Sequence, residues 1–194
     1  MSSSKENYTE FESECLKLSA LFGSTSIILA DNMFTNFKSF AKEFGAMESI
    51  FNGIVKKYPS NSLVQEYFTL DPEKIDMTNV MQIPDQIYSV FEGKGISNSE
   101  LKAYLEIPSI RKLKEEGAAA GLFKRLSYAC MIVAVIAKKI LEDKSHEERG
   151  EFFQAIYDCA EEIAKTAKEG WFGLGDAVSK NEAAILAKLK ENLL

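Results

Sequence analysis

Histidine and cysteine, common ligands of zinc, are scarce in this chain. Its 194 residues include 1 His and 3 Cys, and no two cysteines form a C-x-x-C pair. A zinc site is therefore not expected, because such sites draw most of their ligands from these two residue types. Cys15, Cys130 and Cys159 are odd in number and far apart. They predict buried, reduced thiols rather than a disulfide framework.

Long hydrophobic runs are missing as well. The most apolar stretch, residues 126–137, has 12 residues, whereas a helix needs about 20 to span a bilayer. Extending it toward the N-terminus adds Lys124 and Arg125, which are costly at bilayer depth. We therefore expect a buried core helix and no transmembrane segment. The polar N-terminus lacks the apolar part of a secretion signal, which favours a cytoplasmic protein.

An excess of basic charge is also missing. The chain has 23 Lys+Arg against 29 Asp+Glu, a formal charge of -6. Binding to a nucleic-acid backbone depends on clustered Lys and Arg, so nucleic acid is not an expected partner. With 46% hydrophobic residues, the composition is that of a globular protein long enough to bury a core without metals or disulfides.

Motifs of the common catalytic classes do not occur. There is no G-x-S-x-G sequence, and the glycine pairs 93/95 and 173/175 lack the further glycines of phosphate-binding loops. His146 stands among charged residues at a predicted helix start, where an imidazole is usually exposed to solvent. These observations predict a protein that is not an enzyme.

Proline is rare, and its positions divide the chain. All four prolines lie between residues 59 and 108, so helices there must be short. Apolar residues recur at steps of three and four, and no long alternation predicts a strand. The sequence thus predicts an all-α bundle of about eight helices. Helical patterns lie near residues 11–23, 30–57, 62–70, 84–92, 97–106, 109–116, 118–142, 146–168 and 180–192.

Four of the predicted helices have a capping-box sequence, S-x-x-E or S-x-x-Q, near their start. In this motif two side chains bond backbone N–H groups that have no partner within the first turn. The pairs are Ser62/Gln65, Ser97/Glu100, Ser145/Glu148 and Ser179/Glu182. Their carboxylates therefore have a structural role before any functional one.

The helix predicted for residues 30–57 is rich in phenylalanine. Its apolar residues line one face, which is most simply explained by packing inside the bundle. A surface for a partner helix and a carrier site for an apolar ligand are the alternatives. We assign this helix to an N-terminal helical extension, residues 1–80, that packs on a domain of residues 81–194.

Two charged clusters occur on the predicted helices. Basic residues flank the small-residue stretch 117–121. They could form a docking patch for a partner or a membrane surface, although solvated helix ends are the simpler interpretation. They are Arg111, Lys112, Lys114, Lys124 and Arg125. The acidic cluster fits a divalent-cation site, although a solvated acidic face is the simpler interpretation. It consists of Glu147, Glu148, Glu151, Asp158, Glu161 and Glu162.

The most informative feature is a weak internal repeat. The pattern E-G…[IV]-S-x-x-E occurs within residues 92–100 and again within 169–182, and Ser97 and Ser179 are 82 positions apart. Each copy follows one predicted helix and opens another. A glycine turn, a buried β-branched residue and a capping box are therefore used twice.

This arrangement resembles the TerB-like tellurite-resistance family over about residues 88–194. The resemblance implies an all-α fold and a non-enzymatic role in a stress or defence assembly, through protein binding. It also implies weak binding of a divalent cation such as calcium. The candidate ligands that it implies are Asp176 and Glu182 in the second copy and Glu100 in the first.

Trp171, in the glycine-rich segment of the second copy, is a candidate partner contact. Tryptophan is enriched at binding hot spots, although such a residue more often covers the adjacent core. The alternative function is a stand-alone interaction protein, such as an immunity-type inhibitor whose acidic face covers a basic toxin. The sequence identifies neither the partner nor the oligomeric state.

Overall fold

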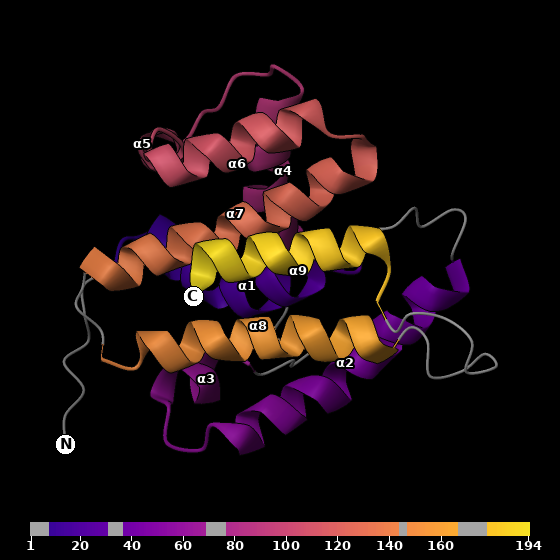
Figure 1. Cartoon of the computed structure of the whole chain (residues 1–194). Helices are drawn as coiled ribbons and strands as arrows, with labels where there is room; N and C mark the ends of the chain where they lie inside the picture. The colour runs from indigo at the N-terminus through magenta and orange to yellow at the C-terminus, as the bar shows by residue number, and fades with distance from the viewer. Residues whose placement is uncertain (1–7, 31–36, 69–76, 144–146, 167–177) are drawn as a thin grey trace.

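The computed structural model describes residues 8–30, 37–68, 77–143, 147–166 and 178–194. Within these ranges the chain forms nine helices and no strand, which confirms the all-α prediction (Figure 1). The helices are α1 (Glu10–Thr25), α2 (Phe37–Lys57), α3 (Ser62–Tyr67), α4 (Met77–Phe91), α5 (Ser99–Leu105), α6 (Pro108–Ala119), α7 (Leu122–Asp143), α8 (Arg149–Thr166) and α9 (Lys180–Leu193). None of these described helices has the length and apolarity required to cross a membrane.

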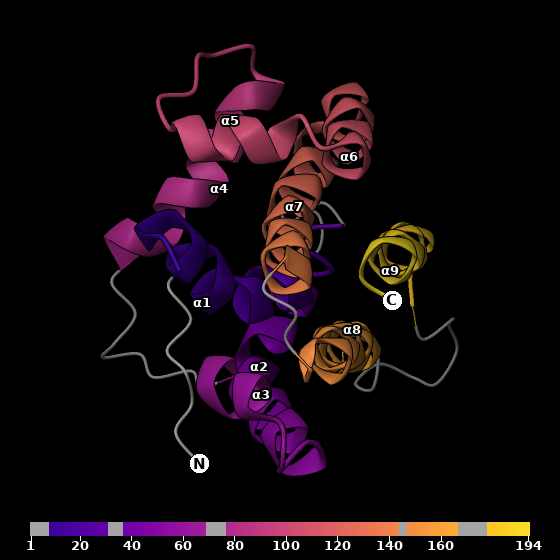
Figure 2. The same ribbon diagram turned by 90° about the vertical axis from the view of Figure 1, so that its left-hand side faces the viewer.

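Helix α7 lies at the centre of the bundle. Every residue from 129 to 137 is at most 5% exposed, because α1, α4, α6, α8 and α9 all pack against this helix (Figure 2). A helix that is apolar on all sides is stable only when it is surrounded. The predicted core helix is therefore confirmed.

Helix α1 crosses α7 and α8 at close range. Its start has a capping box that the sequence analysis did not identify: Glu12 N–H donates to Thr9 Oγ1 at 3.1 Å, and Thr9 N–H donates to the Glu12 carboxylate at 2.9 Å. Near its end, a Cβ added to Gly23 would lie 2.6 Å from Ile156 Cγ2 and 3.1 Å from Ala134 Cβ. The close crossing therefore requires glycine at this position.

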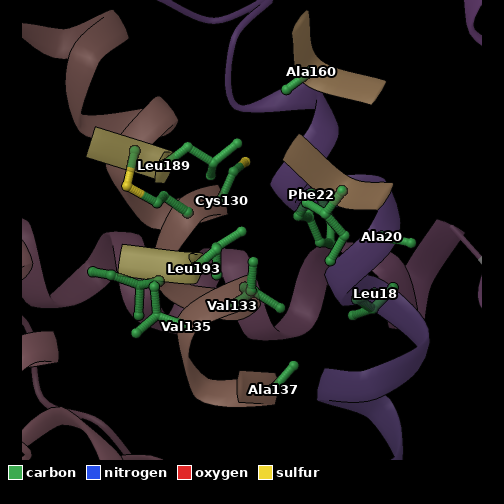
Figure 3. Close-up of a cluster of buried hydrophobic side chains, with 14 of the residues drawn as sticks. Leu18, Ala20, Phe22, Cys130, Val133, Val135, Ala137, Ala160, Leu189 and Leu193 are labelled. Carbon is green, nitrogen blue, oxygen red and sulfur yellow. The ribbon is translucent and has the colours of Figure 1, made fainter. Parts of the chain in front are cut away.

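Residues from distant parts of the chain form one hydrophobic core. Figure 3 shows part of it, where α1, α7, α8 and α9 contribute Leu18, Phe22, Val133, Ala160 and Leu189. Side chains from both sides of residue 80 belong to this core. The division of the chain into 1–80 and 81–194 stays a prediction.

All three cysteines lie in the core. Cys15, Cys130 and Cys159 are buried and free, as predicted from their spacing. Burial raises the pKa of Cys130 and Cys159 to about 12. Burial, together with the nearby Glu14, also raises the pKa of Cys15. Since the thiolate is the reactive form, these three side chains are held in their unreactive state.

Helix α2 ends at Lys57, directly before the Tyr58-Pro59 sequence, as predicted. Its predicted start at Ala30 is wrong, because Ala30 lies in a turn in which its N–H donates to Ile27 O at 3.0 Å. Ala30 is nevertheless buried, so the periodic pattern identified a core residue but assigned it to the wrong element. Most of the phenylalanine-rich face lies outside the described side chains.

Phe51, on the described part of that face, is in an aromatic cluster. Its ring lies 5.2 Å from that of Phe68, and Phe68 lies 6.0 Å from Phe152 of α8. Phe152 in turn lies 5.2 Å from Phe153. These offset and edge-on contacts are favourable for aromatic rings, and they pack α2 and the end of α3 on α8.

Two predicted capping boxes are wrong, because an asparagine caps each helix instead. Asn61 Oδ1 accepts from Val64 N–H at 3.0 Å, and Asn98 Oδ1 accepts from Glu100 N–H at 2.9 Å. Gln65, the predicted partner of Ser62, donates to backbone carbonyls at the end of α2. Asn and Ser are equally good N-caps, so the motif alone does not fix the register. The Ser179/Glu182 box is confirmed, and Ser145 lies outside the described residues.

Helix α4 begins earlier than predicted, since Pro84 lies inside it rather than at its start. Proline in a helix interior removes a backbone hydrogen bond. Packing of α4 on α7 and α6 compensates, and Ile83 and Ile87 are buried there. Pro108 instead stands at the first position of α6, where a missing N–H has no cost. Helices α5, α6, α8 and α9 lie within three residues of their predicted bounds.

The crossing at Gly23 can be tested by adding one methyl group. Gly23→Ala should lower the free energy of unfolding by about 1–3 kcal/mol, because the new Cβ overlaps Ile156. Urea unfolding followed by circular dichroism measures the change. Gly53→Ala in α2 is the matched control, with no atom within 4 Å of its Cβ position. It should add about 0.5–1 kcal/mol by improving helix propensity. Equal stability of the two variants would contradict the close crossing.

Candidate functional site

Glu182, one of the predicted cation ligands, fixes the start of α9. Its Oε2 accepts from Ser179 N–H at 2.5 Å, and its own N–H donates to Ser179 Oγ at 3.1 Å. The residue is only 4% exposed. The capping box thus uses the carboxylate that the sequence analysis assigned to a cation. Asp176 and Trp171, the neighbouring candidates, lie outside the described residues, as does His146.

Glu100, the candidate in the first copy of the repeat, lies in a different part of the bundle. It stands in the first turn of α5, which packs against α6, whereas α9 packs against α8 and α7. Both views place α5 and α9 apart (Figures 1 and 2). Gly93, between α4 and α5, has a φ of 74°, which confirms the predicted glycine turn. In the described ranges, no three His, Cys, Asp or Glu side chains form a group suited to a metal.

The acidic cluster on α8 is engaged within the chain at Asp158. Its Oδ2 accepts from Lys57 Nζ at 2.5 Å and from the Tyr58 hydroxyl at 2.7 Å, and its Oδ1 accepts from Gln154 Nε2 at 2.7 Å. Burial alone would raise the pKa of Asp158, but these hydrogen bonds outweigh burial and lower it. Burial and the bond to Asp158 raise the pKa of Tyr58. This carboxylate therefore fastens the end of α2 to α8.

The same acidic cluster also holds the start of α3. Glu148 accepts from the Ser62 backbone N–H at 2.7 Å and from the Ser62 hydroxyl. Asn61 is 1% exposed, and its side-chain amide donates to Glu148 O at 2.9 Å and to Glu151 at 3.2 Å. Asn61 thus caps α3 with its oxygen and binds α8 with its nitrogen.

Two further acidic residues on α8 share one lysine. Glu161 and Glu162 lie 2.9 and 3.0 Å from Lys165 Nζ, on the surface of the helix. Together with Asp158, Glu148 and the Asn61 contact, these pairs occupy much of the predicted acidic face. The cluster chiefly joins α8 to the turn between α2 and α3. No local sequence pattern reveals these partners, because they are about 90 to 100 positions away in the chain.

The basic cluster extends along α6 and across its connection to α7. We call residues 118–122 the α6–α7 corner. Behind it, a Cβ added to Gly117 would lie 2.9 Å from Tyr128 Cβ and 3.0 Å from the Phe91 ring. Arg125 Nε donates to Ala120 O at 2.8 Å, which satisfies a carbonyl after the end of α6. Gly117, directly before the corner, is therefore closely packed on α4 and α7, whereas most of the corner itself is exposed.

No family model, curated protein or solved structure matches the chain. The TerB-like resemblance thus stays a prediction from the repeat. The two copies share a glycine turn and a capped helix start in the sequence. The described parts show a glycine turn in the first copy, at Gly93, and the complete capping box in the second, at Ser179 and Glu182.

The role of Asp158 can be tested by neutralising its charge. Asp158→Asn should lower the free energy of unfolding at neutral pH by about 1–2 kcal/mol, because it loses charge-assisted bonds to Lys57 and Tyr58. Urea unfolding measures the change. Glu162→Gln, on the same helix and paired only at the surface, should change stability by less than about 0.5 kcal/mol.

The dependence on pH gives the same test a second readout. The folded-state pKa of Asp158 lies below its ordinary value of 3.8. Its contribution is thus complete above that pH and is lost as the pH falls through the lowered value. The difference between wild type and Asp158→Asn should therefore stay constant from neutral pH down to about pH 5 and shrink in stronger acid. A difference that persists in strong acid would contradict an ionic role.

Proposed function

We propose that this protein is a non-enzymatic, TerB-like helical protein of a stress or defence assembly, which acts by binding a protein partner. The observation that best supports the proposal is the outward face of α9. This helix opens with the confirmed capping box of the second repeat copy. It lies at the edge of the bundle, with α7 and α8 on its inner side (Figure 2).

The outward face of α9 is suited to a second helix. Ala183, Ala184 and Ala187 are exposed along it, and Leu194 beyond its end is 48% exposed. Small side chains leave a shallow surface on which a partner backbone can approach. Lys180 and Lys190 are also exposed on α9, so charged groups border the alanines. Ile185 and Leu189 on the opposite side are buried, so this face is presented without disturbing the core.

A photo-crosslinking amino acid at position 187 tests this surface in the full chain. We expect one discrete covalent adduct with a partner protein, and excess unlabelled wild type should suppress its formation. Excess Ala187→Glu should not suppress it, because a charge on the shallow face excludes a close partner. The same crosslinker at the exposed Lys56 of α2 is the matched control and should give no such adduct. Equal competition by wild type and Ala187→Glu would contradict binding through α9.

The proposal includes weak binding of a divalent cation in the second repeat copy, which needs its own experiment. Calcium titration should shift the fluorescence of Trp171 and raise the Tm, and Asp176→Asn should abolish both effects by replacing a charged carboxylate ligand with a neutral amide. Glu182→Ala is the informative control. It should lower stability by about 1 kcal/mol without calcium, because it breaks the capping box. A flat response at millimolar calcium would contradict the cation and leave protein binding untouched.

An immunity-type inhibitor with an acidic face is the alternative. It has less support in the structure, because Glu148 and Asp158 bond Ser62, Lys57 and Tyr58 within the chain. A partner that uses those two carboxylates would have to displace internal donors. Competition of this kind reduces the net gain from a new ion pair.

A further inference from the structure

The α6–α7 corner presents an apolar side chain to solvent. Leu122 is 52% exposed, and among the side chains that the structure describes only Leu194 is a comparably exposed large hydrophobic residue. Ala118, Ala119 and Gly121 beside it are exposed as well. The turn lies at the upper right edge of the molecule in Figure 1, where α6 reverses into α7. The corner therefore presents a small set of exposed apolar and small side chains, and we call it an apolar tip.

Basic charge is concentrated in the segment that contains this tip. Lys114, Lys124 and Arg125 are nearest to it, while Arg111 and Lys112 stand near the start of α6 and Lys112 pairs with Glu191. Residues 111–125 include five basic and two acidic residues, whereas the rest of the chain has 18 basic and 27 acidic. One of the two acidic residues, Glu116, is neutralised by Lys188 at 3.0 Å. Arg111, Lys114 and Lys124 form no ion pair with any residue in the described ranges. Their charges are available to an external anionic surface.

The tip is held in a fixed position by the contacts behind it. Gly117 lies against Tyr128 and Phe91, and the Tyr128 hydroxyl lies 3.2 Å from Glu116. Arg125 Nε bonds Ala120 O, which leaves its terminal nitrogens for other partners. Leu122 is thus exposed on a rigid support, so little conformational entropy is lost when it enters an apolar medium.

We propose that the α6–α7 corner docks the protein on an anionic membrane surface. Leu122 enters the boundary between headgroups and acyl chains, and Lys114, Lys124 and Arg125 contact lipid phosphates. A bilayer accommodates an exposed leucine without a matched pocket, whereas a protein partner would need a pocket that fits it. Basic residues near the surface add attraction to anionic lipids, and an apolar side chain adds depth.

The charge of the rest of the chain orients the protein on the membrane. The rest of the chain is acidic, so an anionic bilayer repels it and favours the orientation in which the corner faces the lipid. Such a contact is peripheral and reversible, because one leucine and a few basic residues are far from a spanning segment. The proposal uses a surface other than the outward face of α9, so the two can fail independently.

Vesicle co-sedimentation of the full chain tests the proposal. Wild type should bind phosphatidylcholine vesicles that contain phosphatidylglycerol, should not bind phosphatidylcholine alone, and should dissociate as salt is raised. Leu122→Ser should lower the partition coefficient about tenfold. Leu194→Ser, at the other exposed leucine, should leave it unchanged. Lys114→Gln with Lys124→Gln should lower it about tenfold or more. All four positions are exposed or half-buried, so the variants should keep the fold, as circular dichroism will verify.

Several results would overturn membrane docking. One is equal binding to neutral and anionic vesicles, and another is an equal loss in Leu122→Ser and Leu194→Ser. Complete competition by millimolar inorganic phosphate would indicate a site for a free anion instead of a bilayer. Wild type that stays in solution with every vesicle, while the corner crosslinks to a soluble acidic protein, would assign this surface to a protein partner.

Discussion

The fold depends on covering α7 from all sides. Its central turns have no polar face, so solvent contact on any side would expose apolar surface, at about 25 cal/mol for each Å². Five helices, α1, α4, α6, α8 and α9, supply that cover. The demand explains why α1, at the beginning of the chain, packs as tightly as its neighbours, and why glycine is needed where it crosses at Gly23. The contacts nearer the surface join the helices that cover α7.

Polar side chains are used mainly to join elements rather than to create a reaction centre. Asp158 of α8 receives a hydrogen bond from Tyr58, between α2 and α3, and Glu148, directly before α8, receives one from Ser62 at the start of α3. A single asparagine, Asn61, satisfies a helix end and a neighbouring helix at once. Acidic residues that look like a ligand set along one helix become structural when a second segment supplies their donors. Binding to partners therefore depends on surface regions whose side chains are not used by hydrogen-bond donors from the chain itself.

The sequence predicted what depends on local chemistry. Helical periodicity located most helices within three residues, and the capping rule identified Ser179 and Glu182. It failed where two local solutions are equivalent, as for Asn61 against Ser62, or where packing outweighs propensity, as for Pro84 inside α4. Of the candidate site, the basic cluster beside the small-residue stretch 117–121 could be identified from the sequence, whereas the exposure of Leu122 could not. The bonds of Asp158 to Lys57 and Tyr58 were not, since no local pattern encodes pairing across a hundred positions.

The three buried thiols link the redox chemistry of this protein to its folding equilibrium. Cys15, Cys130 and Cys159 lie on α1, α7 and α8, the helices that enclose much of the core. An oxidant or electrophile can reach each sulfur only when its helix opens. Even after opening, the raised pKa leaves little of the reactive thiolate until water surrounds the side chain. Damage by oxidants should therefore follow the population of partly opened molecules. Each cysteine acts as a separate internal probe of when its own helix leaves the bundle.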